Sequence, residues 1–235
     1  MKKDLIRSEQ REQRGKPVMQ VCFFLEEKGD CLRISIGGGD NMKKALIFLF
    51  DGFAEFEVNI ASLFLISKQF EIITATVDGK TVTGEGGFLC QPHVSIEQIK
   101  IEDYEVFIVP GGHIFDHLEN EQLLSIVNKL HKQNKWIAGI CAGTSLLHAA
   151  GVLNKKKFST SLTSDEKQLA HLHEWEYKQN KDVTVDGKII TAVGSAYVEF
   201  ATEIMKQLNL FNEAEAKENL QYFKNVTEVC DETLV

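Results

Sequence analysis

The chain has 235 residues, of which 26 are basic and 34 acidic, so its formal net charge at pH 7 is −8. This length favours one domain with appendages over two large domains. The acidic balance repels phosphate groups and argues against general nucleic-acid binding. No run of about 18 uncharged apolar residues and no signal sequence occur, so we expect a cytoplasmic protein without a membrane partner.

The five cysteines are odd in number and widely spaced: Cys22, Cys31, Cys90, Cys141 and Cys230. They lack the short paired spacings of a structural zinc site, and their number argues against a disulfide framework. We therefore expect free thiols, no metal site and no cofactor.

Residues 1–41 differ in pattern from the rest of the chain. A charged opening leads to a Gly-Gly-Gly-Asp-Asn run at 37–41, directly before Met42. We interpret Met42 as the natural start, because an in-frame bacterial ribosome-binding site would encode a similar run. The alternative is a real extension, such as a β-hairpin added to the core.

From Met42 onward, short apolar runs alternate with helical patterns, which is typical of parallel strands buried on both faces. We expect strands at 45–50, 70–76, 106–109 and 136–140, and helices at 58–67, from 121, at 142–150, from 164 and around 201–208. The pattern predicts one α/β domain at 42–210. The charged tail at 211–235 is expected to add a surface helix from Glu213 to about Asn225, docked by Leu220 and Phe223.

Turn and cap residues set several of these boundaries. Hairpins are expected at Asp78-Gly79 and at Asp186-Gly187. Asn120 can cap the helix that follows it, and Gly151 stands where a left-handed cap would end the helix at 142–150. The Pro110-Gly111-Gly112 run must end the preceding strand.

The sequence Gly-Ile-Cys-Ala-Gly at 139–143 has the form of a nucleophile elbow, with cysteine in place of the usual serine. Cys141 then stands between a strand and the N-terminus of a helix, where unpaired amides and the helix dipole favour an anion. We therefore predict a thiolate that is populated at neutral pH. The plain alternative is a buried, inert cysteine.

Two further loops follow strands at the same edge of the predicted sheet. The loop at 51–57 carries Glu55 and Glu57, either of which could stay protonated and donate a hydrogen bond to the sulfur. The plain alternative is that both are ordinary acidic residues in the first turn of a helix. In the Pro-Gly-Gly-His loop, the Gly112 amide could form an oxyanion hole with that of Ala142.

These three elements, in this order, resemble the ThiJ/PfpI family, also called the DJ-one/PfpI family, of the class I glutamine amidotransferase-like superfamily. The resemblance covers 42 to about 210 and includes the Asp186-Gly187 hairpin. It implies a flavodoxin-like three-layer α/β/α sandwich with a mostly parallel sheet, and a homodimer. It also implies that Glu57 is the acid that shares a proton with the nucleophile Cys141, and that Gly112 supplies the oxyanion amide.

The chain departs from this family at the histidine of the triad. The two positions at which family members carry it read Ala142 and Ser161. His113 is one possible substitute, and His171 or His173 would be others if the helix from Ser164 folded over the site. We expect the last two to be surface residues instead, because they point in different directions on a helix. No histidine follows His173, which argues against glutamine amidotransferase activity.

The pattern favours a cysteine-dependent hydrolase or lyase-like enzyme, with intracellular protease or amidase activity or glyoxalase or deglycase activity. Its substrate would be a small carbonyl compound, an adduct of one, or an amide or peptide bond. The missing histidine favours the carbonyl substrate, because amide cleavage needs a group that protonates the amine. The alternative is a redox-responsive stress protein without turnover, whose Cys141 is oxidised to the sulfinic acid.

Overall fold

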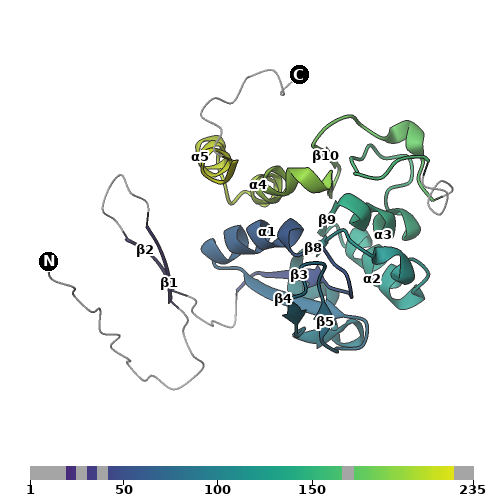
Figure 1. Ribbon diagram of the computed structural model, residues 1–235, viewed down its shortest axis with the longest axis horizontal. Helices are drawn as coiled ribbons and strands as arrows, with labels where there is room; N and C mark the ends of the chain where they lie inside the picture. The colour runs from purple at the N-terminus through teal and green to yellow at the C-terminus, as the bar shows by residue number, and fades with distance from the viewer. Residues whose placement is uncertain (1–19, 25–30, 36–41, 166–171, 225–235) are drawn as a thin grey trace, which may run out of the picture. The chain divides into compact units, whose positions relative to one another are not determined.

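The computed structural model describes residues 20–24, 31–35, 42–165 and 172–224 (Figure 1). The chain divides into two units, 1–41 and 42–235. In the first unit, β1 (Gln20–Phe24) and β2 (Cys31–Ser35) pair in antiparallel fashion. All five α-helices of the described residues belong to the second unit.

The second unit is built on a seven-stranded sheet with the order β10-β11-β9-β8-β3-β4-β7. Its strands are β3 (Lys44–Phe48), β4 (Glu71–Thr76), β7 (Val94–Ser95), β8 (Tyr104–Val109), β9 (Trp136–Ile140), β10 (Val183–Asp186) and β11 (Ile189–Ala192). Neighbouring strands pair in parallel, except for the antiparallel pair β10 and β11. The mostly parallel sheet predicted from the sequence is confirmed.

Helices cover both faces of this sheet. They are α1 (Phe56–Ser67), α2 (Glu121–Lys132), α3 (Thr144–Ala149), α4 (Tyr197–Gln207) and α5 (Glu213–Lys224). Figure 1 shows α1, α4 and α5 together on one face, and α2 with α3 on the other. The result is the expected three-layer α/β/α sandwich. No helix among the described residues is both long enough and apolar enough to cross a membrane.

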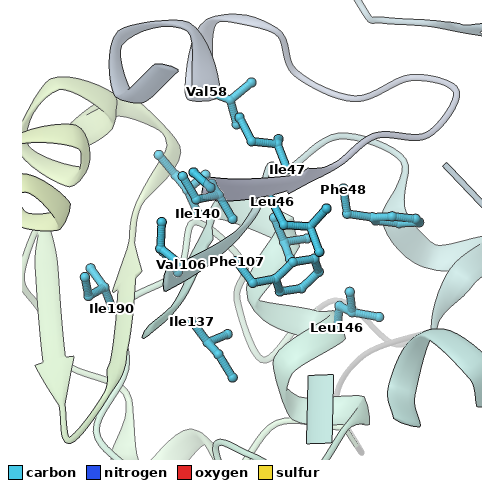
Figure 2. Close-up of a cluster of buried hydrophobic side chains, with 14 of the residues drawn as sticks. Leu46, Ile47, Phe48, Val58, Val106, Phe107, Ile137, Ile140, Leu146 and Ile190 are labelled. Carbon is cyan, nitrogen blue, oxygen red and sulfur yellow. The ribbon is translucent and has the colours of Figure 1, made fainter. Parts of the chain in front are cut away.

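The core is centred on β3, whose side chains alternate between the two helical layers. Leu46 and Ile47 are at most 2% exposed although they point to opposite faces. In Figure 2, Ile47 lies on the side of Val58 from α1, whereas Leu46 and Phe107 lie on the side of Leu146 from α3. A strand covered on both faces needs apolar residues along its buried part, which explains the apolar sequence from Ala45 to Phe48.

Two predicted helix ends are confirmed. The Asn120 side chain accepts a hydrogen bond from the Leu123 amide at 2.9 Å and so caps α2. At the end of α3, Gly151 has a φ of +71°, and its amide donates to the His148 carbonyl at 2.7 Å. The Val152 amide donates to the carbonyl one residue further back, that of Leu147, which completes a Schellman motif.

Two local predictions are wrong or untested. The hairpin predicted at Asp78-Gly79 is wrong: the chain bends at 77–79, but β4 pairs in parallel with β7 and not with the strand that directly follows it. Instead, β5 (Val82–Thr83) and β6 (Leu89–Cys90) pair with each other in a small separate sheet, because the Gly-rich segment between them makes the reversal. Beyond a turn at 164–165, most of the helix expected from Ser164 falls outside the described residues.

Candidate active site

Cys141 lies at a sharp turn from β9 into α3. Its φ is +54°, in the left-handed region that non-glycine residues adopt at a cost on the order of 1 kcal/mol. Behind it, a Cβ added to Gly143 would lie 2.4 Å from the Pro110 carbonyl oxygen. A glycine is therefore needed there so that the turn can pack against the end of β8. The expected elbow is present, with the cysteine at its tip.

Two threonine hydroxyls hold the backbone of this turn. The Cys141 carbonyl oxygen accepts a hydrogen bond from Thr144 Oγ1 at 2.8 Å and another from Thr160 Oγ1 at 2.7 Å. The two hydroxyl oxygens lie 2.9 Å from each other. Both threonines are buried, so this small network helps to maintain the strained backbone at Cys141. Sequence reasoning did not find either residue.

Glu57 is the carboxyl group that meets the sulfur. It lies in the first turn of α1, is 2% exposed and forms a hydrogen bond with the Cys141 thiol. Its Oε2 accepts a hydrogen bond from the Gly111 amide at 2.5 Å. Glu55 instead accepts from the Gly86 amide, at 3.0 Å to each oxygen. Of the two glutamates left open by the loop sequence, only Glu57 has a described contact with Cys141.

The sulfur and the carboxyl group have strongly shifted acidities. Burial raises the pKa of Glu57 to about 7, although hydrogen bonds from Gly111 and Cys141 act against this shift. Burial and the Glu57 charge raise the pKa of Cys141 to about 11, against hydrogen bonds from Ser161 and the Ala142 amide. The prediction of a thiolate at neutral pH is therefore wrong for the resting site. Desolvation and a neighbouring negative charge outweigh the helix terminus.

Such a pair can still generate a nucleophile. A carboxyl group with a pKa near 7 is a suitable general base at neutral pH. When Glu57 is ionised, it can accept the Cys141 proton over the hydrogen bond that already joins the two groups. The site therefore suits a thiol that ionises as it attacks.

The two amides predicted for the oxyanion hole lie in the loops around the sulfur. The Ala142 amide donates toward the Cys141 sulfur. Gly112 has a φ of +98° and pairs with Phe53 in an isolated bridge, and a Cβ on Gly112 would lie 2.0 Å from the Gly52 carbonyl oxygen. Only glycine fits this position. The joint action of the Gly112 and Ala142 amides on a substrate oxygen stays a prediction.

The candidate histidines lie in different surroundings. His113 is exposed, its amide donates to the Gly52 carbonyl at 3.0 Å, and its ring packs beside Gly52. No described contact joins His113 to Cys141 or Glu57, and its catalytic role stays a prediction. His171 lies outside the described residues. Among the described residues, no group of three or more histidine, cysteine or acidic side chains could hold a metal ion.

His173 is not a surface residue, which corrects the sequence-based expectation. It is 5% exposed, and its ring centroid lies 4.1 Å from that of His148 on α3 and 4.8 Å from that of Trp175. The chain at 172–174 is not helical, so the argument from helical directions does not apply to it. His173 instead packs against His148 of α3, the helix that follows Cys141.

Ser161 and Gly194 complete the surroundings of the sulfur, and sequence reasoning assigned neither a role. Ser161 forms a hydrogen bond with the Cys141 thiol, and its Oγ accepts one from the Gly194 amide at 2.7 Å. A Cβ on Gly194 would lie 3.1 Å from the sulfur and 2.6 Å from Glu57 Oε1. Gly194 could have been suspected, because it closely follows the end of β11 at the edge where β9 ends.

The family model described as DJ-1/PfpI matches residues 43–207. The chain belongs to the DJ-1/PfpI family. This confirms the resemblance derived from the elbow, the glutamate loop and the Pro-Gly-Gly loop.

Several relatives have different names. A protein named deglycase from Thermococcus kodakarensis is 26% identical over 151 residues, which cover 63% of this chain and 89% of that protein. Protein dj-1beta from Drosophila melanogaster is 30% identical over 171 residues, or 71% of this chain and 89% of that protein. A protein named uncharacterized protease from Bacillus subtilis is 27% identical over 146 residues, or 62% and 70%. Because these names differ, family membership does not by itself identify the activity, which has to be argued from the site.

The solved structures agree on the fold. A DJ-1 superfamily protein from Agrobacterium tumefaciens aligns with a TM-score of 0.70 and 31% identity, covering 78% of this chain and 98% of that one. A thiJ/pfpI family protein from Bacillus anthracis aligns with a TM-score of 0.72 and 22% identity, covering 80% and 94%. The α/β/α sandwich is therefore common to the three proteins.

Proposed function

We propose that this protein is a cysteine-dependent enzyme that acts on small carbonyl compounds or their adducts. Cys141 is the nucleophile and Glu57 its proton partner. The observation that carries the proposal is the buried hydrogen bond between the Glu57 carboxyl group and the Cys141 thiol at the strained elbow. Relatives named deglycases support a substrate of this class. A homodimer, implied by the family, is part of the same proposal.

The first step is addition of the thiol to a carbonyl group. Glu57 accepts the Cys141 proton while a carbon–sulfur bond forms, and the electron pair of the carbonyl π bond moves onto oxygen. The amides of Gly112 and Ala142 would donate hydrogen bonds to this oxyanion. Glu57 then returns the proton to the oxygen, which yields a neutral hemithioacetal when the substrate is an aldehyde.

This chemistry favours aldehydes over amides. Addition to an aldehyde needs one group that accepts a proton and returns it, and Glu57 can do both. Amide cleavage also needs a group that protonates the departing amine. Ala142 and Ser161 occupy the positions at which a triad histidine was expected, and neither side chain can supply that proton at neutral pH.

The test is a paired assay with methylglyoxal and with an aminopeptidase-type amide. We expect the wild-type protein to consume methylglyoxal, and both Cys141→Ser and Glu57→Gln to lose activity by more than about 100-fold. Cys90→Ser serves as the control, because Cys90 is a free thiol of the second unit that has no described contact with Cys141 or Glu57. Unchanged turnover in Cys141→Ser would exclude the proposed nucleophile.

The redox alternative predicts a different result. A wild-type protein that turns over neither substrate, but gains two oxygen atoms at Cys141 after mild peroxide, would be a redox-responsive protein instead of an enzyme. Intact mass measurement and peptide mapping of the same samples decide between the two.

A further inference from the structure

The segment after α3 returns to the elbow and contacts Cys141 at two atoms. Thr160 Oγ1 donates to the Cys141 carbonyl oxygen at 2.7 Å, and the next residue, Ser161, forms a hydrogen bond with the sulfur. Because Thr160 is 1% exposed and bonded to the elbow, the position of Ser161 beside the thiol is set by the backbone. The hydroxyl groups of two adjacent residues thus bind the carbonyl oxygen and the sulfur of the same cysteine.

The hydrogen bonds of Ser161 show which partner donates. A serine hydroxyl has one hydrogen to donate and two lone pairs that accept. Ser161 Oγ accepts from the Gly194 amide at 2.7 Å, which occupies a lone pair and leaves the hydrogen free for another acceptor. The Cys141 sulfur is such an acceptor: it forms a hydrogen bond with Ser161, and a Cβ on the neighbouring Gly194 would lie 3.1 Å from Sγ.

We propose that Ser161 is a catalytic residue of this site, whose hydroxyl donates a hydrogen bond to the Cys141 sulfur and stabilises the thiolate while Glu57 holds the proton. The inference rests on the proposed function, because it assigns a further residue to the same nucleophile. The direction agrees with the acidity of the thiol, since the Ser161 hydrogen bond acts to lower the pKa of Cys141.

This role also narrows the class of substrate. A hydroxyl group stabilises a thiolate by donating a hydrogen bond, but it does not release its proton near pH 7. The proton of the thiol therefore stays with Glu57, whose carboxyl group also accepts a hydrogen bond from the Gly111 amide. Such a site can add a thiol to an aldehyde or ketone and release it again. Among the described residues, no second acid contacts the Cys141–Glu57 pair to protonate a departing amine.

A matched pair of variants separates the hydroxyl from the volume of the side chain. Ser161→Thr keeps the hydroxyl and Ser161→Val replaces it with a methyl group, so the two differ in one hydrogen-bonding group. Ser161 is exposed, so both variants are expected to fold. Ser161→Val also removes the acceptor of the Gly194 amide, and its thermal unfolding midpoint is therefore expected to fall slightly below that of Ser161→Thr. Ser164→Ala is the control, because it removes an exposed hydroxyl from the same segment.

The measurement is the rate of Cys141 alkylation by iodoacetamide across pH, followed by peptide mapping of the full chain. We expect Ser161→Val to slow alkylation at neutral pH by about tenfold and to move its midpoint to higher pH, because the thiolate loses a donor. Ser161→Thr and Ser164→Ala are expected to follow the wild type.

The outcomes are distinguishable from those of the proposed function, because alkylation needs no substrate. Equal alkylation profiles for Ser161→Val and Ser161→Thr would overturn the role of Ser161, whatever the protein does to methylglyoxal. A slower Ser161→Val would support it even if the wild-type protein has no turnover. Where turnover is present, we expect Ser161→Val to lower kcat for methylglyoxal with little change in KM.

Discussion

The residues around the sulfur hold one proton between two groups that burial makes hard to ionise. Glu57 and Cys141 are joined by a hydrogen bond, and burial raises the pKa of each. A second negative charge on the pair is therefore costly, whereas moving the single proton from sulfur to carboxylate keeps the net charge constant. This explains how a thiol that is protonated at rest can serve as a nucleophile.

A substitution at Glu85 should change the pKa of Glu57 without altering a residue that contacts the sulfur. It is exposed, its amide donates to the Phe53 carbonyl, and its charge contributes to raising the pKa of Glu57. In Glu85→Gln this charge is absent, so Glu57 should ionise at lower pH. We expect the acidic limb of the kcat/KM profile for methylglyoxal to move down by less than about one pH unit at low salt.

Glu97→Gln is the control for this shift, because Glu97 is an exposed acid in a short 3-10 helix (Ile96–Gln98) and has no described effect on Glu57. High salt should reduce the shift in Glu85→Gln, since exposed charges are screened. A shift toward higher pH, or the same shift in both variants, would contradict the assignment of the acidic limb to Glu57.

At the scale of elements, α3 is a weak source of stabilisation for an anion. It has six residues and starts at Thr144, after a 3-10 turn over Cys141–Gly143. The dipole of so short a helix cannot offset the desolvation of a thiol that is largely buried. The elbow therefore positions the Cys141 side chain and strains its backbone, but does little to lower the pKa of the thiol. Stabilisation of the thiolate depends mainly on the hydrogen bonds to the sulfur.

The cap of α2 allows a quantitative test of an element boundary. Asn120→Ala removes the acceptor for the Leu123 amide and is expected to lower the free energy of unfolding by about 1 kcal/mol. Asn128→Ala makes the same substitution inside the helix, where alanine has the higher helix propensity, so we expect a change within about 0.5 kcal/mol. Urea titrations measure both, and equal losses would contradict the capping role.

At the scale of the whole molecule, burial of His148 and of Glu57 makes the free energy of unfolding change with pH in opposite directions. Burial lowers the pKa of His148 from 6.5 to about 4, so the unfolded chain binds this proton more tightly and stability falls as pH drops through that window. Burial raises the pKa of Glu57 from 4.5 to about 7, so the folded protein binds this proton more tightly, and stability falls as pH rises from 4.5 to 7. Each effect amounts to about 3 kcal/mol.

Between pH 4.5 and 6.5 these two contributions have opposite slopes, and single variants should expose each of them. Relative to wild type, Glu57→Gln is expected to gain stability as pH rises from 4.5 to 7. His148→Phe is expected to gain relative stability as pH falls from 6.5 to 4. Urea titrations at several pH values give these differences, and a difference that does not vary with pH would contradict the corresponding shift.

The sequence by itself determined the alternation of strands and helices, the elbow around Cys141 and the Asn120 cap, because each depends on patterns within a few residues. It also indicated the family, because three such local motifs follow one another in a characteristic order. The pattern of the loop at 51–57 left both Glu55 and Glu57 open and only the resemblance favoured Glu57; its contacts became visible in the tertiary structure, since its partner Gly111 lies 54 residues away. Ser161, Gly194 and the buried His173 likewise became visible only in three dimensions. The direction of the Cys141 pKa shift also required the fold, because burial depends on what packs around a group and not on its neighbours along the chain.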